Sequence, residues 1–204
     1  FRIMRLIFVS PKFPQTEIWN DSCSCSELSY SIENGSVGAT TNPVIVLNVL
    51  KKELKDWEPT INQLIADMPS ATEDEIAWET IRAMGTKASK LLMPCFEENK
   101  GKKGRISFQT NAKLYRSKGG MVAHAADLAS SCPNSQIKAP TSKAGVEAFE
   151  EMTYRGISVN ATVSFTTDKS NVCNDVNSIS KKESKINSIY FGFFNKNYTL
   201  KQSF

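Results

Sequence analysis

Short apolar runs alternate with longer segments of helical period along most of this sequence, and no other feature limits the possible folds as much. The runs with strand character lie at residues 17–20, 37–41, 105–108, 136–139 and 157–163. The segments between them are long enough for helices, and strands that alternate with helices are typical of a parallel sheet. We therefore predict an α/β fold built from repeated βα units.

The helical segments carry start signals and apolar stripes. Pro43 can open the first long helix, and residues 72–75, TEDE, fit a capping box at the start of the second. Ser142 can cap a later helix that stops at Gly156. Apolar residues recur at three- and four-residue steps in the first of these segments, at Val46, Val49 or Leu50, Leu54 and Trp57. Each helix is therefore predicted to lay one apolar face on the sheet.

The composition is that of one soluble globular domain. Of the 204 residues, 40% are hydrophobic and 23% are charged, which is enough apolar material for a sizeable core. The formal net charge is only +4, and the lysines and arginines are dispersed among acids along most of the chain. We therefore predict no nucleic-acid partner.

The cysteines do not form a metal-binding pattern. Five are spread along the chain, at Cys23, Cys25, Cys95, Cys132 and Cys173. They include no zinc-like pair of C-x-x-C units, and His124 is the single histidine that could join the C-x-C of residues 23–25. We predict reduced thiols in a cytoplasmic protein and no metal centre.

Residues 1–15 are predicted to be an N-terminal extension. Their first part, FRIMRLIFV, is too short and too interrupted by Arg2 and Arg5 to span a bilayer. It also lacks the small-residue cleavage pattern of a signal peptide. We predict no membrane partner.

The character of the sequence changes after Phe165. Residues 166–204 are rich in Asn, Ser and Lys and have no helical stripe, so they are predicted to be a disordered or spurious tail. Two alternatives stay open: the aromatic run YFGFF at residues 190–194 could form a strand, and a basic tail with aromatic residues could contact RNA.

Polar side chains stand at or near the ends of four predicted strands. Because the carboxyl ends of parallel strands meet at one rim, where loops form the active sites of such folds, these side chains are predicted to converge. They are Asp21, Asn42, Lys138, Asn160 and Thr162. Taken alone, Asp21 and Asn42 also fit ordinary helix caps.

Lys138 lies inside an apolar strand, where desolvation disfavours a charged amine and lowers its pKa. A lowered pKa makes a neutral amine available to attack a carbonyl and form a Schiff base. The structural alternative is a lysine that snorkels to the rim or pairs with a carboxylate such as Asp21. The spacing by itself favours that alternative.

Several ordered strings resemble the transaldolase family. They are GATTNPVIVLNVLKKE (residues 38–53), IKAPTSKAGVEAFEEM (137–152) and GISVNATVSF (156–165), with weaker likeness in WNDSCSCSEL (19–28) and GRISFQTNAKLYR (104–116). The resemblance implies a partial (β/α)8 TIM barrel over residues 16–165. It also implies transfer of a dihydroxyacetone unit from sedoheptulose 7-phosphate to glyceraldehyde 3-phosphate, a step of the pentose phosphate pathway that needs no cofactor.

The same resemblance assigns roles to the polar residues. It makes Lys138 the Schiff-base nucleophile and Asp21 the acid that shuttles protons. It implies that Asn42 orients the hydroxyls of the bound dihydroxyacetone, and that Asn160 and Thr162 hold the intermediate and a catalytic water.

Gln109 departs from the family pattern, which usually has glutamate at the end of the third strand. Glutamine can position a water molecule by hydrogen bonds but cannot take its proton. Related aldolases that split fructose 6-phosphate into dihydroxyacetone and an aldehyde also carry glutamine there. The sequence therefore leaves transfer and aldol cleavage as alternatives, with Gln109 as a catalytic residue in either.

A complete barrel of this type needs roughly 250 residues, and the resemblance stops after the fifth strand. The later strands would carry the serine and arginine that hold the substrate phosphate. We expect open sheet edges as a result, and a frameshift, intron read-through or gene truncation near Phe165. A catalytically inactive barrel fragment is the further alternative.

Overall fold

A computed structural model describes residues 16–162, 189–195 and 198–202 of the chain. The predicted N-terminal extension, and the predicted change of character at residue 165, lie outside the described residues. Among the helices of the described part, none combines the length and the apolar character needed to cross a membrane.

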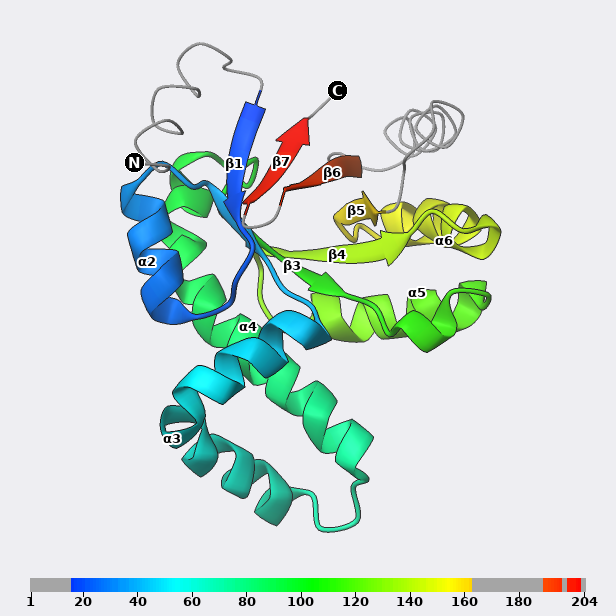
Figure 1. Ribbon diagram of the computed structural model, residues 1–204. Helices are drawn as coiled ribbons and strands as arrows, with labels where there is room; N and C mark the ends of the chain where they lie inside the picture. The colour runs from blue at the N-terminus through cyan, green and yellow to red at the C-terminus, as the bar shows by residue number, and fades with distance from the viewer. Residues whose placement is uncertain (1–15, 163–188, 196–197, 203–204) are drawn as a thin grey trace.

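Five parallel strands form the first part of the sheet, each hydrogen-bonded to the next in chain order (Figure 1). They are β1 (Thr16–Asn20), β2 (Gly38–Thr40), β3 (Arg105–Gln109), β4 (Ser135–Pro140) and β5 (Val159–Thr162). Each coincides with a predicted strand to within a few residues. The predicted α/β fold, with five parallel strands and helices between successive strands, is therefore confirmed.

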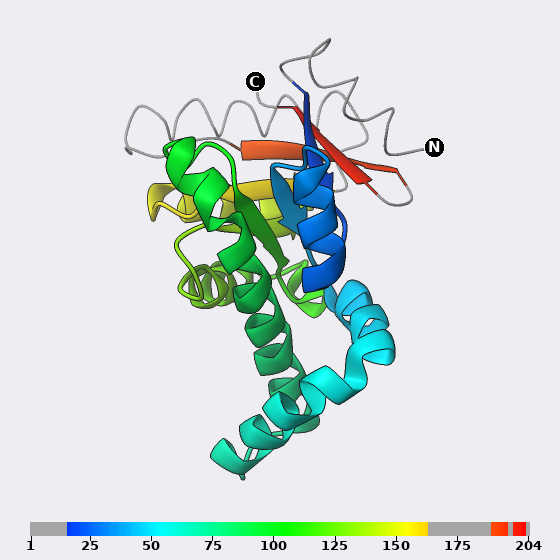
Figure 2. The ribbon, with the colours of Figure 1, turned by 90° about the vertical axis from the view of Figure 1, so that its left-hand side faces the viewer.

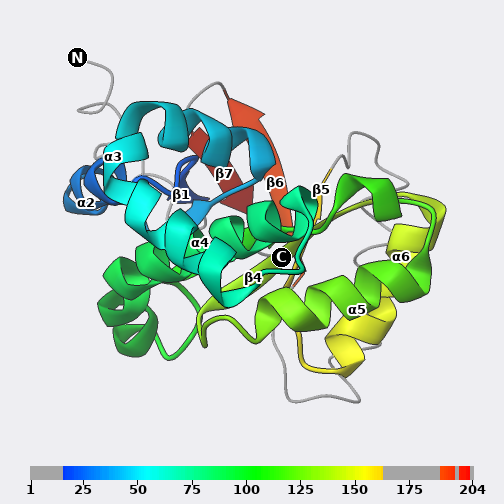
Figure 3. The same ribbon diagram turned by 90° about the horizontal axis from the view of Figure 1, so that it is seen from below.

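Helices connect these strands and cover the outer face of the curled sheet (Figures 1 and 3). They are α2 (Cys25–Glu33), α3 (Pro43–Asp67), α4 (Glu73–Glu98), the short 3-10 helix η1 (Ala112–Leu114), α5 (Lys118–Ala129) and α6 (Lys143–Tyr154). The capping box at Thr72 and Glu75 is present, and Ser142 caps α6 by accepting a hydrogen bond from the Gly145 amide. The start signals in the sequence thus act as predicted.

Two long helices, rather than one, connect β2 with β3. Helices α3 and α4 pack on each other and extend away from the sheet (Figure 2). Helix α3 bends at Glu53, whose backbone leaves the helical region with φ −118° and ψ 24°. The Glu53 carboxylate accepts hydrogen bonds from Ser24 Oγ at 2.6 Å and from Trp57 Nε1 at 3.4 Å. The Ser24 bond ties the bend of α3 to the start of α2.

The core lies between the sheet and its helices. Apolar side chains alternate along β2 to β5 and meet buried residues of the helices. On these strands they are Ala39, Ile106, Phe108, Ile137, Ala139, Val159 and Ala161, and on the helices they include Leu28, Met84, Leu92, Met121, Leu128, Phe149 and Met152. Burial of each large side chain contributes roughly 1.5–3 kcal/mol.

Gly85 sets the close approach of α4 to β3. A Cβ added there would overlap the ring of Phe108. We expect Gly85→Val to lower the free energy of unfolding by about 1–3 kcal/mol, because overpacking forces shifts in a dense core. Urea denaturation measures this loss.

The matched control is Gly119→Ala in α5, where an added Cβ has no atom within 4 Å. The control should be neutral or stabilising by up to about 1 kcal/mol, and equal midpoints for Gly85→Val and wild type would contradict the packing.

Two further strands close the sheet. Strand β6 (Ile189–Asn195) pairs parallel to β5, and β7 (Tyr198–Gln202) pairs antiparallel to both β6 and β1, which gives a closed ring. The prediction of open sheet edges is therefore wrong. In the five parallel strands alone, β1 and β5 would be edge strands with unpaired backbone groups. A further strand of high β-propensity can pair with such groups. The aromatic run at residues 190–194 lies in β6, as the alternative of a strand in the tail anticipated.

The two closing strands also differ from the regular barrel. A (β/α)8 barrel has parallel strands throughout, whereas β6 and β7 run antiparallel and are separated by only residues 196–197. A connection this short can join antiparallel strands but cannot make a parallel crossover. The described residues therefore combine five parallel strands and the helices between them with a hairpin, in the segment that we predicted to be a disordered or spurious tail.

Candidate active site

The inner face of the sheet is polar. Two hydrogen bonds prove that side chains meet across it, because each skips the strand between its partners. Lys138 Nζ of β4 donates to Thr40 Oγ1 of β2 at 3.0 Å, and Asn160 Nδ2 of β5 donates to Ser107 Oγ of β3 at 3.2 Å. Polar residues thus occupy the strand positions between the apolar ones of the core.

Lys138 lies deep in this interior. Its side chain is 2% exposed, and Gln109 and Asn160 are its register partners on the two neighbouring strands. Burial lowers the pKa of Lys138 to about 8, and the negative charge of Asp21 opposes this shift. The alternative of a lysine that snorkels to the rim is therefore wrong. The amine has a raised fraction of the neutral, nucleophilic form at neutral pH.

Asp21 follows β1 directly and does not cap a helix. The N-cap of α2 is Ser24, whose Oγ accepts the Glu27 amide, so the alternative of an Asp21 cap is wrong. The Asp21 Oδ1 atom is buried and has no hydrogen-bond partner among the described residues. Burial raises the pKa of Asp21, and attraction to Lys138 lowers it. A buried carboxyl with a raised pKa beside an amine is a candidate for proton transfer.

Asn42 does act as a cap. Its Oδ1 accepts a hydrogen bond from the Ile45 amide at 2.9 Å and begins α3. The side chain is half-buried at the carboxyl end of β2. The cap fixes the orientation of the carboxamide, whose amide group can still donate to a ligand.

Asn160 and Thr162 lie on β5 beside Lys138. Asn160 is buried and held by Ser107, as described above. Thr162 is also buried, and its hydroxyl donates to the Ala139 carbonyl of β4 at 3.1 Å. The structure therefore brings Asn160 into the polar interior, whereas the Thr162 hydroxyl is bonded to the backbone next to it.

Gln109 ends β3 next to Lys138. Its side chain is half-buried, and the following residue, Thr110, donates from its amide to the Lys138 carbonyl at 2.9 Å. The structure thus brings Gln109 to the neighbouring strand position. The loop after β3 is anchored to the same residue.

The sequence did not single out Thr40 or Ser107, the two hydroxyls that hold Lys138 and Asn160. Both occupy inward positions that alternate with buried apolar neighbours. The isolated polar residue in RISFQ is a signal that could have revealed Ser107. Thr40 shares the string GATTN with Asn42 and carries no separate signal.

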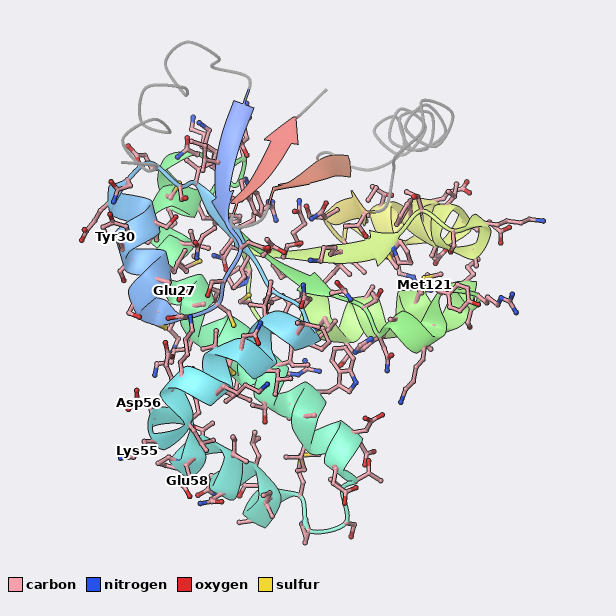
Figure 4. All side chains as sticks on the ribbon, viewed as in Figure 1. Glu27, Tyr30, Lys55, Asp56, Glu58 and Met121 are labelled. Atoms are coloured by element: carbon pink, nitrogen blue, oxygen red, sulfur yellow. The ribbon has the colours of Figure 1, made fainter. Side chains whose placement is uncertain are left out.

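A polar cavity of about 500 Å³ adjoins Asp21 on the side of α2 and α3. Its walls include Tyr30, Asn48 and an ion pair between Lys52 Nζ and Glu27 Oε1 at 3.0 Å. Figure 4 places Glu27 and Tyr30 on α2. Asp21 is itself one of the residues that line this cavity.

The Transaldolase/Fructose-6-phosphate aldolase family model matches residues 18–203 of this sequence. The chain belongs to this family. The matched residues include β2 to β5, whose side chains form the polar contacts across the interior. The match also extends past residue 165, where the quoted transaldolase strings end.

Curated transaldolases show the same relationship. The chain is 32% identical to Transaldolase 2 of Streptomyces avermitilis over 139 residues, which cover 65% of this chain and 36% of that protein. It is 29% identical to a transaldolase of Neisseria meningitidis serogroup C over 157 residues, or 73% of this chain and 44% of the relative. A transaldolase of Thiobacillus denitrificans is 34% identical over 137 residues, 65% and 37% of the two chains. The chain thus spans between a third and a half of the length of these relatives.

Proposed function

We propose that this chain acts as a transaldolase that moves a dihydroxyacetone unit between sugar phosphates through a Schiff base on Lys138. The observation that carries the proposal is the setting of Lys138, a buried lysine held by Thr40 in the interior of a transaldolase-family barrel. The substrates we propose are sedoheptulose 7-phosphate and glyceraldehyde 3-phosphate. The proposed setting is the cytoplasm and the pentose phosphate pathway.

The proposed chemistry starts with attack of the neutral Lys138 amine on the ketose carbonyl. Loss of water from the carbinolamine and cleavage of the carbon–carbon bond each require a proton moved at a fixed place. Asp21 supports that role, because burial raises its pKa and its charge acts on Lys138. The protonated imine accepts the electron pair of the broken bond, and the dihydroxyacetone unit then adds to the aldehyde of the acceptor.

The neighbouring side chains support binding of a polyol. Asn160 lies on β5 and Asn42 lies at the cap of α3, just after β2. Each is fixed by a hydrogen bond, Asn160 to Ser107 and Asn42 to the Ile45 amide. Preorganised amides of this kind can bind hydroxyls at little cost in side-chain entropy. We propose that Thr162 joins Gln109 in holding a catalytic water after release of its bond to the Ala139 carbonyl.

Gln109 supports a second candidate function within the same family, the cleavage of fructose 6-phosphate to free dihydroxyacetone and an aldehyde. The residue lies beside Lys138 in register. Its carboxamide can hold a water molecule but cannot deprotonate it. Comparing acceptor-dependent transfer with release of free dihydroxyacetone separates the two reactions.

Borohydride trapping with fructose 6-phosphate tests the shared first step. We expect reduction to leave a covalent adduct on Lys138, which peptide mass spectrometry locates. A full-length relative under the same conditions is the positive control. Labelling of the relative without labelling of this chain would favour an inactive barrel fragment.

A further inference from the structure

The loop between β3 and α5, residues 110–117, is held at three separate points. The Asn111 amide donates to His124 Nδ1 of α5 at 3.0 Å. The Lys113 ammonium pairs with Asp74 of α4 at 3.0 Å, and Ser142 Oγ donates to the Tyr115 carbonyl at 2.6 Å. The loop begins directly after Gln109, so these contacts bear on the polar interior.

His124 is positioned by its packing as well as by this hydrogen bond. Its ring stands edge-on to Trp78 of α4, with ring centroids 4.6 Å apart and an interplanar angle of 90°. Because Nδ1 accepts the Asn111 amide, the ring must carry no proton at that nitrogen. An imidazolium would set one N–H group against another. The contact therefore exists only with the neutral ring.

The charged groups around His124 come from two helices and the loop. Burial is the largest influence on the pKa of His124 and lowers it below the ordinary 6.5. Asp127 of α5 opposes this shift by raising the pKa, and Arg82 of α4 lowers it further. Arg82 is itself paired with Asp127 and Glu79. The loop contributes Lys113, which is bound to Asp74.

We propose that His124 is a positioning residue for Gln109. The neutral His124 ring accepts the Asn111 amide, which fixes the start of the loop after β3 and thereby holds Gln109 beside Lys138. Thr110 lies between Gln109 and Asn111 and connects the loop to Lys138. Its amide and its hydroxyl both donate to the Lys138 carbonyl, at 2.9 Å and 3.4 Å. Protonation of the ring releases the loop after β3. The effect of this release on catalysis rests on the proposed function. The release of the loop on protonation of His124 does not depend on that function.

The direction of the pH dependence follows from the pKa. Because the pKa of His124 lies below 6.5 in the folded chain, the unfolded chain binds more protons between these two values. The stability of the loop contact is therefore complete above 6.5 and is lost as the pH falls through the folded pKa. Acid should loosen residues 110–117 before it affects the core strands.

Amide hydrogen exchange of the full chain, followed by mass spectrometry between pH 5 and 8 and corrected for intrinsic rates, tests this proposal. In wild type, the protection of residues 110–117 should fall at the acid end by roughly three- to tenfold, the value of one hydrogen bond. His124→Gln keeps an acceptor that does not titrate, so its protection should not depend on pH. His124→Phe keeps a ring against Trp78 but no acceptor, so its exchange should be fast throughout.

Helix α2 (Cys25–Glu33), which lies apart from this loop, reports whether each variant stays folded. Equal protection of residues 110–117 in wild type and a folded His124→Phe would overturn the proposal. If His124→Phe fails to fold, the comparison with His124→Gln decides, and an equal pH dependence in wild type and His124→Gln would overturn it. The exchange measurement needs no substrate, so failure of the borohydride test would leave this result unaffected.

Discussion

Replacing Lys138 with methionine is expected to abolish the borohydride adduct and any carbon transfer while stabilising the fold. Methionine has nearly the same length and fits the buried path of the side chain, but it has no amine to attack a carbonyl. Loss of a covalent nucleophile should lower turnover to background. Mass spectrometry of the trapped protein and a coupled assay of sugar transfer check this part.

The gain in stability comes from burial of the amine. Burial lowers the pKa of Lys138 from 10.5 to about 8, so the unfolded chain binds more protons than the folded chain between these values. Stability therefore rises with pH through that window, and the full penalty is present below pH 8. At 1.36 kcal/mol per pKa unit the penalty is about 3 kcal/mol. Loss of the positive charge beside Asp21 offsets part of the gain.

Urea denaturation at pH 7 and near pH 10 measures this effect. Lys138→Met should exceed wild type in stability at pH 7, and the difference should shrink at the higher pH. Lys143→Met is the matched control, since Lys143 is exposed on α6, and it should change stability little at either pH. The same advantage at both pH values would contradict a buried, titrating amine, and an adduct in Lys138→Met would identify a different nucleophile.

The strands and caps were predictable from the sequence because their signals are local. Alternation of apolar residues, the capping box at Thr72 and the cap at Ser142 each depend on a few neighbouring residues. The cap of α2 was harder to assign, because several neighbouring side chains in the string NDSCS could each act as the N-cap. Ser24 is the cap in the structure: its Oγ accepts the Glu27 amide, and its backbone is extended, with φ −62° and ψ 125°, as is typical of a helix N-cap.

The candidate site was predictable only in part. Its main residues stood out as polar groups near strand ends, and the family resemblance gave them roles. The partners Thr40 and Ser107 depend on contacts between strands far apart in sequence, which no local pattern reports. The same holds for the burial of Lys138 and for closure of the sheet by β7, because both depend on which strands become neighbours.

Changing Asp21 to asparagine is expected to separate Schiff-base formation from turnover. Asparagine cannot move a proton, so loss of water from the carbinolamine and cleavage of the carbon–carbon bond should each slow by about 10²- to 10⁴-fold. The slower imine formation should still reach completion on long incubation, whereas repeated turnover should not recover. The charge of Asp21 raises the pKa of Lys138, and its removal should shift the pH of half-maximal trapping downward. Trapping at saturating substrate should therefore persist at lower pH, while carbon transfer is lost.

Asp56→Asn is the matched control for this variant. Asp56 is exposed at the bend of α3, away from the sheet (Figure 4), and its loss should alter neither the pH of trapping nor turnover. If turnover falls in Asp21→Asn but the trapping profile stays in place, the carboxylate acts on the substrate without acting on Lys138. Unchanged turnover would instead remove Asp21 from the proton transfers.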